Sequence, residues 1–140
     1  IRKVNNMLKK LASDFRFMQL YAHNGHNLVK GQTFFEDHEY LGSLYSIYED
    51  IYDGLIERMI GLGEEVDLIA INEAALKTLK EAGTSSDPKQ LFAACLQFEQ
   101  YICSQAEKML PNYTEGTKQM LGNICDNSEM RQYKLKQRIA

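Results

Sequence analysis

Tryptophan is absent from this 140-residue sequence, and proline and cysteine are scarce, with two and three residues respectively. Leu, Lys, Glu, Met, Gln and Ala are frequent instead, and this composition favours helix over sheet. No apolar run approaches the roughly 20 residues that span a bilayer, and no charged segment followed by an apolar one opens the chain. We therefore expect one all-α domain over residues 1–140 that is cytoplasmic and has no membrane partner.

The cysteines are too few to indicate a disulfide framework. Cys95 and Cys103 are eight residues apart on what is predicted to be one helix. That spacing separates them by about 12 Å along the helix axis, which is too far for a disulfide. We therefore interpret Cys95, Cys103 and Cys125 as reduced core cysteines of a cytoplasmic protein.

The formal net charge is −3. This argues against a partner such as DNA that is bound by bulk electrostatics, because such binding requires a basic face. The charge is more consistent with a protein that collects cations. Basic residues do gather near both ends, so DNA stays a less favoured partner; they are Arg2, Lys3, Lys9, Lys10, Arg131, Lys134, Lys136 and Arg138.

Apolar residues recur three or four positions apart, the spacing of one helix face. The pattern predicts long helices over residues 1–28, 34–62, 88–110 and 114–140, and a short one over 72–81. Thr33 and Glu36 are spaced as a capping box, and Asp87 precedes Pro88 as an N-cap. The connection between the second and third long helices is long, about two dozen residues including the short helix. The prediction is a ferritin-like four-helix bundle with an extra helix in that crossover.

Histidine is confined to one part of the sequence. His23, His26 and His38 fall within sixteen residues, and the last two long helices contain none. The usual di-iron site of a helical bundle needs a Glu-x-x-His pair on each of two helices. No histidine here has a glutamate three positions before it. A di-iron site in the bundle core is therefore not expected.

A different metal site is predicted on the second helix. Asp53 and Glu57 are four residues apart and share a face, about 6 Å from each other along the axis. His38 lies fifteen residues before Asp53, or about 22 Å along the axis, so one chain cannot bring them to one metal. Two chains can, if they meet antiparallel about a two-fold axis that crosses the helix near Tyr45 and Ser46.

His26 lies near the end of the first helix, where it can reach the same place as His38. Two imidazoles and two carboxylates suit iron(II), with zinc as a competitor. We therefore predict His26, His38, Asp53 and Glu57 as the metal ligands and catalytic residues. His23 is interpreted as a surface or capping group.

These residues resemble the Dps family, the dodecameric miniferritins. The resemblance is carried by Tyr21-Ala22-His23-Asn24, His26-Asn27-Leu28-Val29-Lys30-Gly31, Phe34, His38, Asp53, Ile56-Glu57-Arg58 and Leu62-Gly63. In the family pattern, two histidines are twelve residues apart, and an Asp and a Glu follow the second histidine by fifteen and nineteen residues. All four residues match here. The resemblance implies a ferroxidase that forms a hollow homododecamer with sites at its two-fold interfaces. It also implies hydrogen peroxide as oxidant and storage of a ferric mineral.

Two positions depart from the family pattern. Gly42 stands where the family usually has an acidic ligand, and Asn27 stands where it usually has tryptophan. We therefore expect one strong iron position with a weak neighbour. Two alternatives stay open: a DNA-compacting shell protein whose metal site is weakened, and a bundle with a zinc or purely structural two-fold site.

Overall fold

Helices account for most of the protein, for which a computed structural model describes residues 2–140, without the side chains of residues 2–6 and 112. Ile1, with which the first predicted helix starts, lies outside the described residues, as do the side chains of Arg2, Lys3 and Val4. The helices are α1 (Arg2–Leu28), α2 (Phe34–Gly61), α3 (Leu68–Ala82), α4 (Pro88–Met109), the short 3₁₀ helix η1 (Leu110–Asn112) and α5 (Glu115–Ile139).

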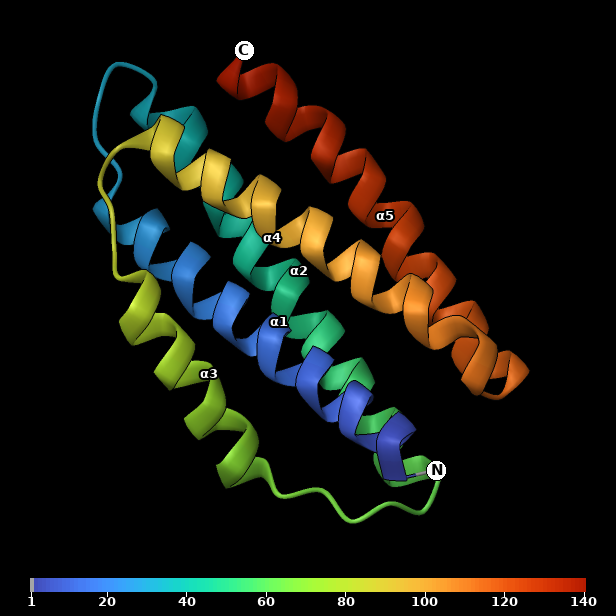
Figure 1. Ribbon diagram of the computed structural model, residues 1–140. Coiled ribbons are helices and arrows are strands. Elements are labelled where there is room, and N and C mark those ends of the chain that lie inside the picture. Colours follow the sequence, from blue (N-terminus) through green and yellow to red (C-terminus); the bar gives the residue numbers. More distant parts are fainter. Residues whose placement is uncertain (1) are drawn as a thin grey trace.

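The four long helices lie alongside one another, and α3 lies outside them, against α1 (Figure 1). The closest packing joins α1 to α2 and α4 to α5. No strand occurs in residues 2–140. The predicted all-α four-helix bundle, with an extra helix in the crossover from α2 to α4, is therefore confirmed. Within the same residues, no helix is both long enough and apolar enough to cross a bilayer.

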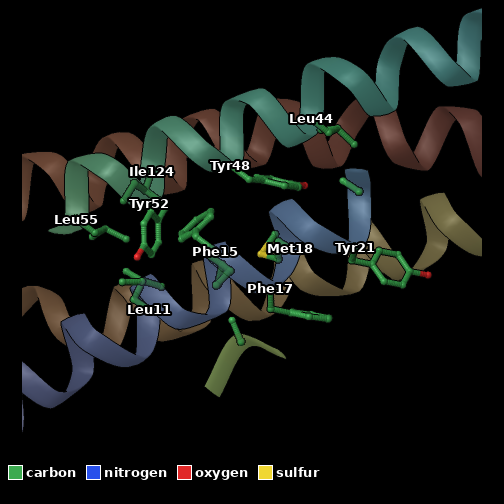
Figure 2. Close-up of a cluster of buried hydrophobic side chains, with 14 of the residues drawn as sticks. Leu11, Phe15, Phe17, Met18, Tyr21, Leu44, Tyr48, Tyr52, Leu55 and Ile124 are labelled. Carbon is green, nitrogen blue, oxygen red and sulfur yellow. The ribbon is translucent and has the colours of Figure 1, made fainter. Parts of the chain in front are cut away.

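The predicted apolar faces form the core. Figure 2 shows side chains of α1 meeting those of α2 in the interior of the bundle, among them Leu11, Phe15 and Met18 from α1 and Leu44, Tyr48 and Tyr52 from α2. Each of these side chains is at most 4% exposed. Burial of such side chains contributes about 1.5–3 kcal/mol each, so this interior is the main source of the fold's stability.

The crossover helix is longer than predicted. It begins at Leu68 rather than near residue 72 and has 15 residues. The Asp67 carboxylate caps it by accepting a 3.0 Å hydrogen bond from the backbone N–H of Ala70. Only Ile71 and Ala75 of this helix are buried. Leu68 and Ile69 in its first turn are apolar but exposed, so the apolar run before residue 72 did not show where the helix begins.

The predicted capping box at Thr33 does not form, because its hydroxyl has other partners. It donates to Asp37 Oδ2 at 2.6 Å and accepts from Arg138 Nη2 at 3.1 Å. Arg138 also donates through Nε and Nη2 to the two Asp37 oxygens, at 3.1 and 3.0 Å. Burial alone would raise the pKa of Asp37, but these hydrogen bonds and the guanidinium charge lower it below its ordinary value. This cluster, the Arg138 clip, fastens the end of α5 to the start of α2.

Asp87 occupies the predicted N-cap position of α4, but its side chain makes no capping hydrogen bond. Instead, its backbone N–H donates to Ser85 Oγ at 3.1 Å. The start of α4 was predicted correctly, but the expected capping hydrogen bond from the Asp87 side chain does not form.

A charged network lies in the middle of the bundle. The Glu99 carboxylate on α4 is 0% exposed and is paired with Arg131 on α5, which donates through Nε and Nη2. Tyr48 on α2 donates its hydroxyl to Glu99 Oε2 at 2.7 Å. Burial and the Glu99 charge raise the pKa of Tyr48 well above its ordinary value, so it remains a protonated donor. This Glu99 network thus links α2, α4 and α5.

We predict that Arg131→Met will destabilise the protein strongly, by about 3–5 kcal/mol, because it leaves the Glu99 charge buried and unpaired. Urea unfolding at fixed protein concentration measures the loss. The double variant Glu99→Gln/Arg131→Met should recover part of the stability, since no charge is left inside. Lys134→Met on the exposed face of α5 is the control and should have little effect. A similar, small effect of Arg131→Met and Lys134→Met would contradict the role of the pair.

Candidate metal centre

His26 and His38 are brought together by the tight connection between α1 and α2. Gly31 has a φ of 123°, in the left-handed region that favours glycine, and so reverses the chain after α1. The Lys30 backbone N–H donates to Ser86 O at 3.0 Å, which fastens this connection to the loop before α4. As a result, the last turn of α1 lies beside the second turn of α2.

The two imidazole rings stack, with centroids 3.7 Å apart and planes at 18°. His26 Nδ1 lies 2.7 Å from the backbone carbonyl oxygen of His38, and His38 Nδ1 lies 2.7 Å from that of His26. A carbonyl oxygen only accepts, so each Nδ1 is the donor and carries the proton. The lone pair of each neutral ring is then on Nε2. Bonds of this kind fix the orientation and tautomer of metal-binding histidines.

Gly42 makes room for this arrangement. A Cβ at position 42 would lie 3.2 Å from both Cε1 and Nδ1 of His26, which is tighter than ordinary van der Waals contact. The His26 ring therefore rests against α2 where a larger residue would place its side chain. The His26 ring thus lies against position 42, where this chain has glycine and the family pattern has an acidic residue.

Three further rings border the histidine pair. His23, one turn before His26, stacks on Tyr45 with centroids 4.0 Å apart and planes at 4°. Tyr45 in turn lies 5.5 Å from the His26 ring, and Phe34 lies 5.0 Å from the His38 ring. His23 and Tyr45 were not predicted to belong to the site. Their spacing could have indicated that they share helix faces with the histidine pair, because His23 is three residues before His26 and Tyr45 is seven after His38.

Asp53 and Glu57 lie elsewhere, on the exposed side of α2, one turn apart. Fifteen residues of helix separate His38 from Asp53, or about 22 Å. Within residues 2–140, no three His, Cys, Asp or Glu side chains come close enough together to hold a metal ion. One chain therefore assembles the two imidazoles of the predicted site and leaves both carboxylates apart from them.

Comparisons with known proteins match the whole fold. The model of the ferritin-like domain matches residues 5–140. The DNA protection during starvation protein of Helicobacter pylori (strain J99 / ATCC 700824) is 33% identical over 97 residues, which cover 68% of this chain and 67% of that protein.

Solved structures are similar over nearly the full length. The Dps protein of Vibrio cholerae O1, described as a ferritin-like diiron-carboxylate protein, is 20% identical with a TM-score of 0.88, and the match covers 99% of this chain and 90% of that one. Helicobacter cinaedi CAIP is 24% identical with a TM-score of 0.83, and the match covers 98% of this chain and 99% of that one. At these identities the likeness establishes the fold, and the sequence relationships identify the family.

Proposed function

This chain belongs to the Dps family of ferritin-like proteins, and we propose that it is a ferroxidase that oxidises iron(II) at sites shared between two subunits. The family relationship supports a general role in iron storage and protection. In the specific proposal, the ferric product is held as a mineral inside a hollow shell of twelve copies of the chain.

The observation that carries the proposal is the histidine pair. Hydrogen bonds from Nδ1 to backbone carbonyls fix both rings before any metal arrives, and they leave two Nε2 atoms as ligands. Two neutral imidazoles are half of a metal site, because an iron ion also needs ligands that offset its charge. In this chain the carboxylates of Asp53 and Glu57 are exposed and available to a second subunit.

An antiparallel contact between the α2 helices of two subunits completes the site. The point midway between His38 and the two carboxylates falls near Ser46 and Ile47, and both residues are exposed on α2. A two-fold axis at this point places His26 and His38 of one subunit beside Asp53 and Glu57 of the other. The same axis generates a second, identical site, so each pair of subunits has two.

The ligand charges suit iron oxidation. Two carboxylates neutralise iron(II), and they attract the ferric product more strongly because it carries one more positive charge. With hydrogen peroxide as the oxidant, one peroxide and two protons take an electron from each of two iron(II) ions and become two waters. No hydroxyl radical is released in this stoichiometry. Because Gly42 supplies no carboxylate, we propose one strong iron position in each site and a weaker neighbour. Zinc would compete for the strong position.

We predict that His38→Ala and Glu57→Ala will each slow peroxide-driven iron(II) oxidation at least about tenfold, because each removes one ligand. The rate is followed by ferric absorbance after anaerobic iron loading. Glu49→Ala, which removes another exposed carboxylate of α2, is the control and should behave as the wild type. Particle mass must be unchanged in all three variants. Wild-type rates in both ligand variants would refute the assignment.

Mixing the two slowed variants distinguishes a site shared between subunits from a site within one chain. In a mixed pair, one site combines the intact histidines of one subunit with the intact carboxylates of the other, while the second site loses both. Random co-assembly of His38→Ala and Glu57→Ala chains should therefore restore about a quarter of wild-type activity. No recovery in particles shown by mass spectrometry to contain both chains would contradict the shared site.

The DNA-compacting alternative has less support from the charges of the chain. Three of the basic residues near the ends form ion pairs within the chain, and each pair offsets a positive charge that could otherwise attract phosphate. The pairs are Lys10 with Asp14, Arg131 with Glu99, and Arg138 with Asp37.

We therefore predict no retardation of plasmid DNA by the assembled protein, even at about 50 mM salt, where phosphate contacts are strongest. The measurement is a gel-shift series over increasing salt. Retardation that fades as salt rises, together with absent iron oxidation, would instead favour the DNA-binding alternative.

A further inference from the structure

Two of the three cysteines face each other across the contact between α4 and α5, away from the histidines. The Cys103 thiol points toward the backbone carbonyl of Cys125 at 3.7 Å, and the Cys125 thiol points toward that of Cys103 at 3.9 Å. This reciprocal pattern means that residues 103 and 125 lie directly opposite each other on the two helices.

We propose that Cys103 and Cys125 form a redox pair, which a hydroperoxide such as hydrogen peroxide converts into a disulfide that joins α4 to α5. Cys95 and Cys103, whose spacing is too long for a disulfide, share one helix. The opposing pair instead comes from two helices, 22 residues apart in the chain. The proposal does not depend on the iron site.

The surroundings assign a role to each thiol. Cys125 is partly exposed and is therefore the one that a peroxide reaches first, whereas Cys103 is only 8% exposed. Gln132 donates from Nε2 to Cys103 Sγ at 3.4 Å and to Ser128 Oγ at 3.1 Å, so Cys103 has a polar partner that holds it in place. Cys103 is thus positioned as the resolving thiol.

The reaction proceeds in two balanced steps. The Cys125 sulfur attacks one peroxide oxygen, so that an S–O bond forms, the O–O bond breaks, and the other oxygen leaves as water after it takes up a proton. The Cys103 sulfur then attacks the Cys125 sulfenic acid, which forms the S–S bond and releases a second water. In total, two thiols and one hydrogen peroxide give one disulfide and two waters.

The pair is slow to react at neutral pH. Burial and, after it, the neighbouring Cys103 raise the pKa of Cys125 to about 12, and the thiolate is the reactive form. The thiols therefore stay reduced during brief exposure and become oxidised only under sustained peroxide. The resulting cross-link closes the segment that contains η1 and the turn into α5.

The test uses assembled, iron-free protein treated with hydrogen peroxide and then with N-ethylmaleimide under denaturing conditions. The number of alkylated thiols should fall from three to one, and dithiothreitol should restore all three. Non-reducing tryptic digestion should link peptide 90–108 to peptide 119–131. The first peptide contains both Cys95 and Cys103, so the bond is assigned in a Cys95→Ser variant, which should still form it.

Two further variants make the outcome decisive. Cys103→Ser should stop at a Cys125 sulfenic acid that dimedone traps, and Cys125→Ser should keep both remaining thiols alkylatable. Circular dichroism and particle mass verify that each variant folds. The iron-site variant His38→Ala should form the cross-link as the wild type does. A failure of the redox proposal can therefore be distinguished from a failure of the proposed ferroxidase function. Two outcomes would overturn the proposal. One is that all three thiols are still alkylated once the peroxide has fully oxidised the methionines. The other is irreversible oxidation of Cys125 without a cross-link.

Discussion

The ion pair between Glu99 and Arg131 is the constraint on which the rest of the structure depends. It is buried between α4 and α5, and Tyr48 joins it to α2. The Tyr48 ring also packs against Phe15 of α1, with centroids 6.1 Å apart, so all four long helices meet at this point. The pair engages both oxygens of Glu99, a carboxylate in the bundle interior. That carboxylate is therefore not free to bind a metal, and the stacked histidines at the α1–α2 connection are the ligands that we propose instead.

Much of this could be predicted because it is local. Helical periodicity gave the four long helices, since one face of each is buried. The spacing of His26, His38, Asp53 and Glu57 could be read from the sequence, and helix geometry alone separates the histidine pair from the carboxylates. Which subunit supplies which ligand is a proposal that follows from that geometry.

What escaped prediction involves partners distant in sequence. Thr33 was expected to cap α2, but Arg138, 105 residues later, competes for its hydroxyl through a charge-assisted network. Glu99 has no local feature that distinguishes a buried carboxylate from an exposed one, because its partner Arg131 is 32 residues away. The Cys103–Cys125 contact was missed because cysteine spacing was considered along one helix and not across two. The role of Gly42 is evident only once the position of the His26 ring is known.

The Arg138 clip has a practical consequence for work with this protein. Its partner Asp37 directly precedes His38, so any segment that follows residue 140, natural or engineered, leaves the bundle close to the histidine pair. The start of α1 lies at the opposite end of the bundle (Figure 1). An affinity tag or fluorescent label placed at the carboxyl end would lie beside the histidines and would compete for space with the proposed two-fold contact. The amino end is the better place for such an attachment.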